Sequence, residues 1–196
     1  MSDTIDDIGP RESRTYAFAK PPISFKTTRK RLIHLDLIGG GGGGGAGGST
    51  SSGGGGAAGE HRLEQVTLEP GRYILEIGDG GAGGVNKRDK RGTSGTKGGD
   101  SALRNAQSNL VLLSAKGGAG GTREAGKNPD LGVKGADMVV EGKVLAKGGA
   151  GGKWDADGKP GKAPGAGGGG HGGYNGPETD HGGKGGAGRA IIFFID

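Results

Sequence analysis

The sequence predicts an all-β protein in which a small β-sandwich or sheet is combined with a layer of packed polyglycine II helices. Three observations lead to this fold class. Short apolar runs of strand length recur along the chain, and glycine units with a regular spacing lie beside them. Glycine also accounts for 52 of the 196 residues, far above the usual fraction of about 7%.

The glycine units share a three-residue period, as in Lys116-Gly-Gly-Ala-Gly-Gly-Thr122. This period is typical of polyproline II geometry, which has three residues per turn, a rise of about 3.1 Å per residue and no internal hydrogen bonds. Two glycines in every three leave two sides of such a helix as bare backbone, so neighbouring helices can pack closely. A flexible glycine linker is the alternative, but phased glycines between strand-like runs argue against it. The units are 43–49, 79–85, 116–122, 147–153 and 181–187.

The apolar runs are expected to form the strands of one small core. Residues 32–38 alternate with period two, which indicates a strand with one buried face. Residues 61–77 are predicted to be a hairpin around Pro70-Gly71, because proline sets φ and glycine accepts positive φ in turns. Arg29-Lys30-Arg31 is expected to be a solvated rim. The remaining strands are predicted at 110–115, 138–146 (a strand pair or a bulged strand) and 191–195.

Residues 1–30 differ in composition from the rest, so we divide the chain into an extended N-terminal arm, 1–30, and a glycine-rich β/polyglycine II domain, 31–196. Pro21-Pro22 favours an extended conformation over a helix. Two interpretations stay open. The arm docks on a partner protein, or it is an edge strand that covers this domain's own core. The side chains that would serve in docking are Tyr16, Phe18, Ile23 and Phe25.

Composition and motifs argue against several classes of function. There is no cysteine, no Walker A motif, no Gly-x-Ser-x-Gly elbow and no convincing nucleophile–base pair, so an enzyme is the least expected class. No apolar run approaches the length of a membrane span, and the acidic N-terminus predicts synthesis in a cytoplasm without a secretory signal. The net charge of +5 is dispersed, so no nucleic-acid partner is expected. His171, Asp180 and His181 could approach one another as metal ligands, but we expect no metal and no cofactor.

The loops between glycine units are the candidate binding regions, because exposed loops on a rigid scaffold commonly carry binding residues. Trp154 and Tyr174 are aromatic residues in polar, glycine-rich surroundings, where they could stack on a sugar or anchor a protein contact. Alternatively, each covers the edge of the glycine layer. The receptor-binding candidates are Trp154, Tyr174, Asn175, Arg88, Lys90 and Arg123.

The order of these features resembles the glycine-rich domain of bacteriophage tail and tail-fibre proteins. A strand enters the glycine run at 39–48, Leu68-Glu-Pro-Gly-Arg-Tyr73 follows, and the chain closes with Gly185-Gly-Ala-Gly-Arg-Ala-Ile-Ile-Phe-Phe194. More loosely, the sequence is similar to polyglycine II adhesins at tail-fibre tips. The resemblance covers about residues 31–196 and implies a virion protein assembled in the host cytoplasm. It also implies a homo-oligomer, with a trimer favoured, and loops that recognise a bacterial surface glycan or outer-membrane protein.

Two other functions remain open at this point. A head or tail decoration subunit would use the same N-terminal arm to hold other virion proteins, without binding a receptor. Copy number separates the two, because an adhesin is present in few copies and a decoration protein in many. An ice-binding or matrix protein is the third interpretation, which the abundant lysine on the third-position face and the lack of a signal peptide disfavour.

Overall fold

The computed structural model describes residues 3–4, 13–17, 22–48, 50–86, 92–123, 131–153, 156–172 and 181–195. These residues contain strands and no helix, so the predicted all-β class is confirmed. The strands are β1 (Asp3–Thr4), β2 (Ser13–Ala17), β3 (Ile23–Thr27), β4 (Arg31–Ile38), β5 (His61–Leu68), β6 (Gly71–Glu76), β7 (Ser101–Asn105), β8 (Val111–Ala115), β9 (Met138–Val140), β10 (Lys143–Ala146) and β11 (Arg189–Phe194).

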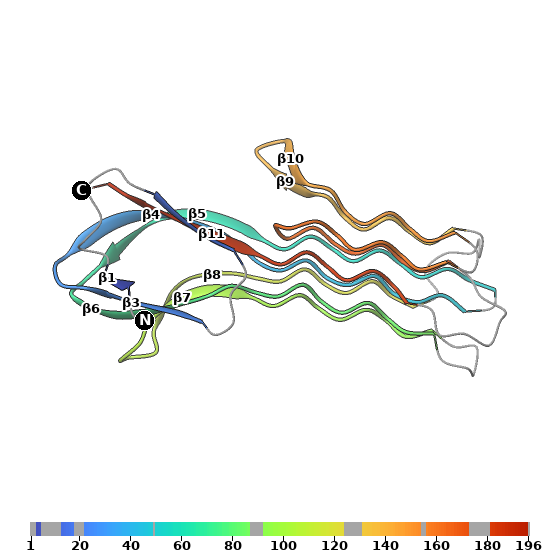
Figure 1. The fold of residues 1–196 in the computed structure, drawn as a ribbon, viewed down its shortest axis with the longest axis horizontal. Coiled ribbons are helices and arrows are strands. Elements are labelled where there is room, and N and C mark those ends of the chain that lie inside the picture. The colour runs from blue at the N-terminus through green and yellow to red at the C-terminus, as the bar shows by residue number, and fades with distance from the viewer. Residues whose placement is uncertain are drawn as a thin grey trace.

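Two sheets face each other at one end of the molecule (Figure 1). One has the strand order β1-β3-β6-β7-β8 and the other β2-β11-β4-β5. Apart from the parallel β1–β3 pair, neighbouring strands of these sheets are antiparallel. The two-stranded β9–β10 hairpin is separate and projects from the side of the molecule near the sheets.

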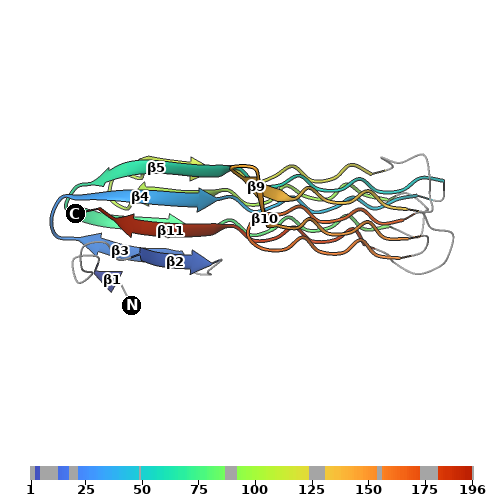
Figure 2. The same cartoon turned by 90° about the horizontal axis from the view of Figure 1, so that it is seen from above.

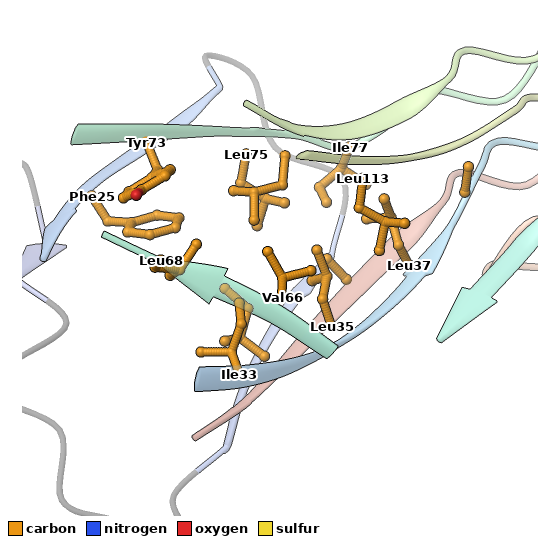
Figure 3. Packing of buried hydrophobic residues seen from close by; sticks show 14 of the residues in the cluster. Phe25, Ile33, Leu35, Leu37, Val66, Leu68, Tyr73, Leu75, Ile77 and Leu113 are labelled. Carbon is orange, nitrogen blue, oxygen red and sulfur yellow. The ribbon is translucent and has the colours of Figure 1, made fainter. Parts of the chain in front are cut away.

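The core lies between the two sheets and is filled by their alternating side chains (Figure 3). In β4, Ile33, Leu35 and Leu37 are completely buried, while the residues between them are partly exposed. This is the period-two pattern expected for a strand with one buried face. At one end of the core the rings of Phe25 and Tyr73 stack with their centroids 5.6 Å apart.

The expected 61–77 hairpin is wrong, because its two strands belong to different sheets. β5 pairs with β4, whereas β6 pairs with β3 and β7. The turn at Glu69–Pro70 therefore crosses from one sheet to the other. Leu68 enters the core from one sheet and Tyr73 from the opposite sheet (Figure 3). Hydrogen bonds from the hydroxyls of Thr27 (2.9 Å) and Tyr73 (2.7 Å) to the carbonyl of Glu69 hold this crossing in place.

One residue of the expected solvated basic rim is buried. Arg31 is 1% exposed, and its guanidinium lies 5.9 Å from the centroid of the Phe194 ring. Arg31 occupies the inward phase of β4, two residues before Ile33. Arg31 is therefore buried because residue 31 is an inward position of the strand, although arginine usually prefers solvent.

The described part of the N-terminal region consists of strands of the domain's own sheets. β3 pairs with β6 over five residue pairs, and β2 pairs with β11. Phe25 is completely buried in the core and Ile23 packs against it. For these two residues the structure matches the interpretation of a strand that covers the domain's own core, and Phe25 is not accessible for docking. Tyr16 lies in β2 opposite Ala190, and Phe18 lies outside the described residues.

Beyond the sheets the chain runs back and forth in long, gently waving segments, which extend as a bundle in one direction (Figures 1 and 2). The end of the bundle away from the sheets is called the distal end below. These glycine segments comprise residues 39–48, 53–60, 78–86, 92–100, 116–123, 131–137, 147–153, 156–163, 165–172 and 181–188.

The segment 39–48 lies in the interior of the bundle, and its successive N–H groups bond to three neighbours in turn. Carbonyls on the same segment accept bonds from three further neighbours. The hydrogen-bonding direction thus repeats every third residue. The donated bonds are Gly39 to Glu60, Gly40 to Gly99, Gly41 to Gly186, Gly42 to Ala57, Gly43 to Thr96, Gly44 to Gly183, Gly45 to Gly54 and Ala46 to Thr93, at 2.8–3.0 Å; the accepted bonds include those from Gly118 to Gly40, Gly81 to Gly41 and Gly168 to Gly42.

The segment 165–172 is the second interior segment. Apart from Gly165, its residues bond in the same rotating manner to six neighbours, 39–45 among them, and residues 165–172 are buried throughout. The other segments lie around these two, and each of them has partly or fully exposed residues. Glycine is required at the contacts: a Cβ on Gly42 would lie 1.9 Å from the carbonyl oxygen of Ala119.

Residues 138–146 form a strand pair, as one of the two sequence interpretations held. Val144 pairs with Val139, and the register shifts between Val144 and Ala146. Glu141 and Gly142 connect the strands with positive φ values of 48° and 76°. Met138 and Ala146 anchor the hairpin in a second small core with Ile38 and Ala166, at the junction of sheets and bundle.

Candidate functional site

The distal end of the bundle gathers segment ends from the whole length of the chain. Isolated β-bridges join neighbouring ends there: Gly48 to Ser51, Val85 to His181, Asn86 to Gly92 and Leu131 to Lys153. The stretches 87–91, 124–130, 154–155 and 173–180 lie outside the described residues, and the described residues that flank them lie at this end. Stretches far apart in sequence are thus attached to one end of a single scaffold.

Most of the predicted receptor-binding residues fall in those stretches. Trp154, Tyr174, Asn175, Arg88 and Lys90 lie outside the described residues. Arg123 is described, exposed and at the distal end, where its backbone N–H donates a hydrogen bond to the Ser94 hydroxyl at 3.2 Å. The scaffold therefore brings the flanks of the candidate residues together, and it positions Arg123 directly.

Three polar side chains at the distal end are buried, which the sequence analysis did not predict for any of them. Ser52, Asn86 and His171 are each at most 1% exposed. The amide of Asn86 and the hydroxyl of Ser52 have no hydrogen-bond partner within the described residues. Buried polar atoms are normally paired, so these two groups retain hydrogen-bonding capacity. No sequence signal indicates the burial of Ser52 and Asn86. Each lies at the end of a glycine-rich segment, and these segments resemble the others in composition.

A second concave feature lies where the β9–β10 hairpin projects over the four-stranded sheet. It is a pocket of about 410 Å³. Asp36 lies on its sheet side and accepts hydrogen bonds from His61 (3.1 Å) and Arg189 (3.4 Å). The hairpin supplies an apolar wall with a charged rim. No sequence pattern indicates the pocket, because its lining comes from four distant parts of the chain: Asp36, His61, Arg189 and the hairpin residues Val140, Glu141, Lys143, Val144 and Leu145.

Carboxylates on the bundle surface cap the N–H groups of peripheral segments. Asp100 accepts a bond from the backbone of Gly117 at 2.8 Å, and Asp137 accepts one from Gly148 at 2.7 Å. Each also pairs with a lysine three residues earlier, Lys97 and Lys134 respectively. The three-residue period of the glycine units places both partners of each pair on one side of a segment.

These contacts favour the ionised form of both carboxylates. The hydrogen bond from Lys97, followed by that from Gly117, lowers the pKa of Asp100. The hydrogen bond from Lys134, followed by that from Gly148, lowers the pKa of Asp137. A carboxyl group with a lowered pKa in the folded state stabilises the fold above its unfolded-state pKa of about 3.9, and this stabilisation is lost as the pH falls through the folded-state value.

We therefore expect Asp100→Asn to lower the free energy of unfolding. The decrease should not vary with pH near neutrality, and it should become smaller as the pH falls below about 4. Urea unfolding at a series of pH values measures this difference. Lys97→Gln should reduce the effect of Asp100→Asn in a double-mutant cycle, because the lysine is the main cause of the shift. A difference that stays constant down to the acid transition would show that Asp100 is not coupled to folding.

Neither a metal cluster nor a membrane helix occurs in the described part of the chain. No group of three or more His, Cys, Asp or Glu side chains comes together there. Of the three residues considered as ligands, His171 is buried at the end of an interior segment, His181 is exposed on a peripheral one, and Asp180 lies outside the described residues. The same part of the chain contains no helix of the length and hydrophobicity needed to cross a bilayer.

The comparison with protein families matches most of this architecture. The model of the glycine-rich domain covers residues 24–194, from the second residue of β3 to the last residue of β11. The chain belongs to the glycine-rich domain family. In this glycine-rich domain the match includes the strands from β3 to β11 and all the glycine segments, whereas β1 and β2, the edge strands of the two sheets, lie before it. No curated protein gives a significant match to the chain.

Proposed function

We propose that this glycine-rich domain protein is a structural protein of a bacteriophage virion, a tail-fibre or tail-tip component with receptor-binding loops at the distal end. The observation that carries the proposal is the attachment of several chain stretches to one end of a hydrogen-bonded scaffold, opposite the sheets. Binding residues commonly lie on loops that a rigid scaffold positions. The proposed receptor is a bacterial surface glycan or outer-membrane protein.

We further propose that the glycine segments are polyglycine II helices. Two facts support this geometry. The direction of the backbone hydrogen bonds repeats every three residues, and residues 39–46 donate all their bonds to other segments. A three-residue repeat without hydrogen bonds inside the segment is typical of polyproline II geometry, which has three residues per turn and no internal hydrogen bonds. Such a scaffold is rigid because each interior segment is held by six neighbours.

In this proposal the sheet end of the molecule faces the virion and its other proteins. Leu63, Phe193 and Ile195 are 41–51% exposed at this end. Tyr16, Phe18 and the rest of the N-terminal arm remain the proposed contact to other virion proteins, without Phe25, which is buried. A trimer is the proposed assembly, and analytical ultracentrifugation would measure it.

The test is binding of fluorescently labelled protein to bacteria that the parent phage infects. We expect saturable binding that the double variant Trp154→Ala, Tyr174→Ala loses. The matched control is Leu63→Ala, which removes an exposed apolar side chain from the outer face of the sheet and should bind as the unmodified protein does. Absence of binding to every susceptible strain would contradict the adhesin and favour a decoration subunit, which copy number per virion would then test.

A further inference from the structure

Lysines on most faces of the bundle have carboxylate partners. Lys97 pairs with Asp100 at 2.6 Å, Lys134 with Asp137 at 2.8 Å, and Lys184 with Asp79 at 3.1 Å. On these faces the positive charge is largely neutralised locally.

One face differs. Lys147 and Lys153 on segment 147–153 are exposed, as are Lys159 and Lys162 on the neighbouring segment 156–163. None of the four has an ion pair among those formed by the described residues. We call these four residues the lysine ridge.

The backbone fixes how the lysine ridge is arranged. The N–H of Lys159 bonds to the carbonyl of Ala150 at 2.9 Å, and the N–H of Lys162 bonds to that of Lys147 at 3.1 Å. The two segments are therefore neighbours that run in opposite directions, with Lys162 level with Lys147. In polyglycine II geometry, Lys159 and Lys162 are offset by about 9 Å along the bundle and point the same way.

Two described carboxylates, Asp137 and Asp157, bear on the charge of the lysine ridge. Asp137 lies close enough to Lys147 for that charge to help lower its pKa, but Lys134 and the Gly148 N–H come first. Asp157 accepts a hydrogen bond from the backbone of His181 at 2.6 Å. A hydrogen bond from a neutral N–H leaves the negative charge of Asp157 in place. The four lysines still outnumber this one carboxylate among the described residues of the two segments, whose backbone is hydrogen-bonded to neighbouring segments.

We propose that the lysine ridge is a lateral binding site for an acidic polysaccharide. A linear polymer can lie along the bundle and engage several lysines at once, and linked weak contacts of this kind add up through effective concentration. The axial offset of about 9 Å is roughly the length of two sugar rings, so a chain with one carboxylate per disaccharide fits best. The assignment of such a polymer to a bacterial surface rests on the proposed function, but the binding site itself does not.

Nucleic acid fits the lysine ridge less well. Duplex DNA carries one charge per about 1.7 Å of axis, several times denser than this row of lysines. The described residues of the two segments, 147–153 and 156–163, include neither an aromatic residue nor an arginine, whereas single-strand binding uses stacking on aromatic rings. An open, sparsely charged face suits a sparsely charged polymer.

The experiment measures binding of the full chain to hyaluronan, which has one carboxylate per disaccharide, with neutral dextran and duplex DNA as comparisons. We expect hyaluronan to bind, dextran not to bind and DNA to bind more weakly. Binding should disappear at about 1 M salt, where the Debye length is about 3 Å. Replacing the four ridge lysines by glutamine should weaken binding by at least about tenfold, and replacing all four by arginine should preserve it.

The matched control replaces Lys97, Lys116, Lys134 and Lys184 by glutamine, which removes the same net charge from other faces. We expect less than about a twofold effect, with circular dichroism and thermal unfolding used to verify that each variant is folded. Equal losses in both glutamine variants, or tighter binding of DNA than of hyaluronan, would overturn the proposal. Saturable binding to cells by a protein that does not bind hyaluronan would overturn the lysine ridge alone, and hyaluronan binding without cell binding would overturn only the receptor proposal.

Discussion

Gly42→Ala is expected to unfold the glycine bundle or to destabilise it by more than about 3 kcal/mol. An added Cβ would lie 1.9 Å from the carbonyl oxygen and 2.5 Å from the carbonyl carbon of Ala119. Both are backbone atoms of a neighbouring segment, so no side chain can rotate away. That segment also receives hydrogen bonds from other segments, so moving it disturbs several contacts at once.

Chemical denaturation followed by circular dichroism measures this effect against Gly71→Ala. Gly71 begins β6, and the nearest atom to its added Cβ is 3.9 Å away, so we expect a change of less than about 1 kcal/mol there. Because the free energy of unfolding of natural domains is only about 5–15 kcal/mol, the unfolding free energies of the two variants should differ measurably. Equal stability of Gly42→Ala and the unmodified protein would mean that the segments are not packed as described.

Phe25→Ala is expected to cost about 3–5 kcal/mol, the usual range for removing a buried phenylalanine side chain. Phe25 is completely buried, and its ring stacks on Tyr73 across the paired strands β3 and β6. The loss would include both the buried apolar area and the stacking contact. The result bears directly on the N-terminal region, because a free docking arm would contribute nothing to the stability of the domain.

The control is Lys26→Ala, one residue along the same strand, where the side chain is exposed. We expect it to change the unfolding free energy by less than about 0.5 kcal/mol. Thermal or urea unfolding of both variants gives the comparison. If Phe25→Ala were as stable as Lys26→Ala, β3 would not be part of the folded core in solution.

Strong local patterns predicted much of this fold. The alternation in 32–38 identified β4 and its buried face, and the apolar runs at 110–115, 138–146 and 191–195 correspond to β8, β9–β10 and β11. The three-residue glycine period predicted segments that pack side by side. These features depend on local sequence, where a residue's neighbours fix its environment.

Features that depend on pairing between distant residues could not be predicted. Pro70-Gly71 suits a hairpin and a crossing between sheets equally well, and only the partners of β5 and β6 distinguish the two. Arg31 is buried because β4 is inward at that position, although its charge suggested solvent. Nor does any residue pattern show that segments 39–48 and 165–172 are interior, since other segments have similar glycine content.

The same limit applies to the candidate site. Residue type suggested Trp154 and Tyr174, which lie outside the described residues, as binding residues. It is the alignment of segments from the whole chain that brings the described flanks of these residues to one end of the bundle. The pocket beside the β9–β10 hairpin and the lysine ridge depend in the same way on the alignment of distant segments, so the sequence does not predict them. In the ridge, Lys147 is fifteen residues from Lys162 in sequence, yet their segments are hydrogen-bonded at the same level.

Amide hydrogen exchange measured residue by residue by NMR tests the packed glycine bundle most directly. Every N–H from Gly39 to Ala46 donates a bond to another segment and should exchange slowly. On the peripheral segment 118–122, the N–H groups of Gly118 and Gly121 bond to the interior, whereas 119, 120 and 122 donate no bond within the described residues. We expect continuous protection in the first stretch and protection at every third residue in the second. Rapid exchange throughout, as in a flexible linker, or protection at alternate residues, as in a β-strand, would contradict the account.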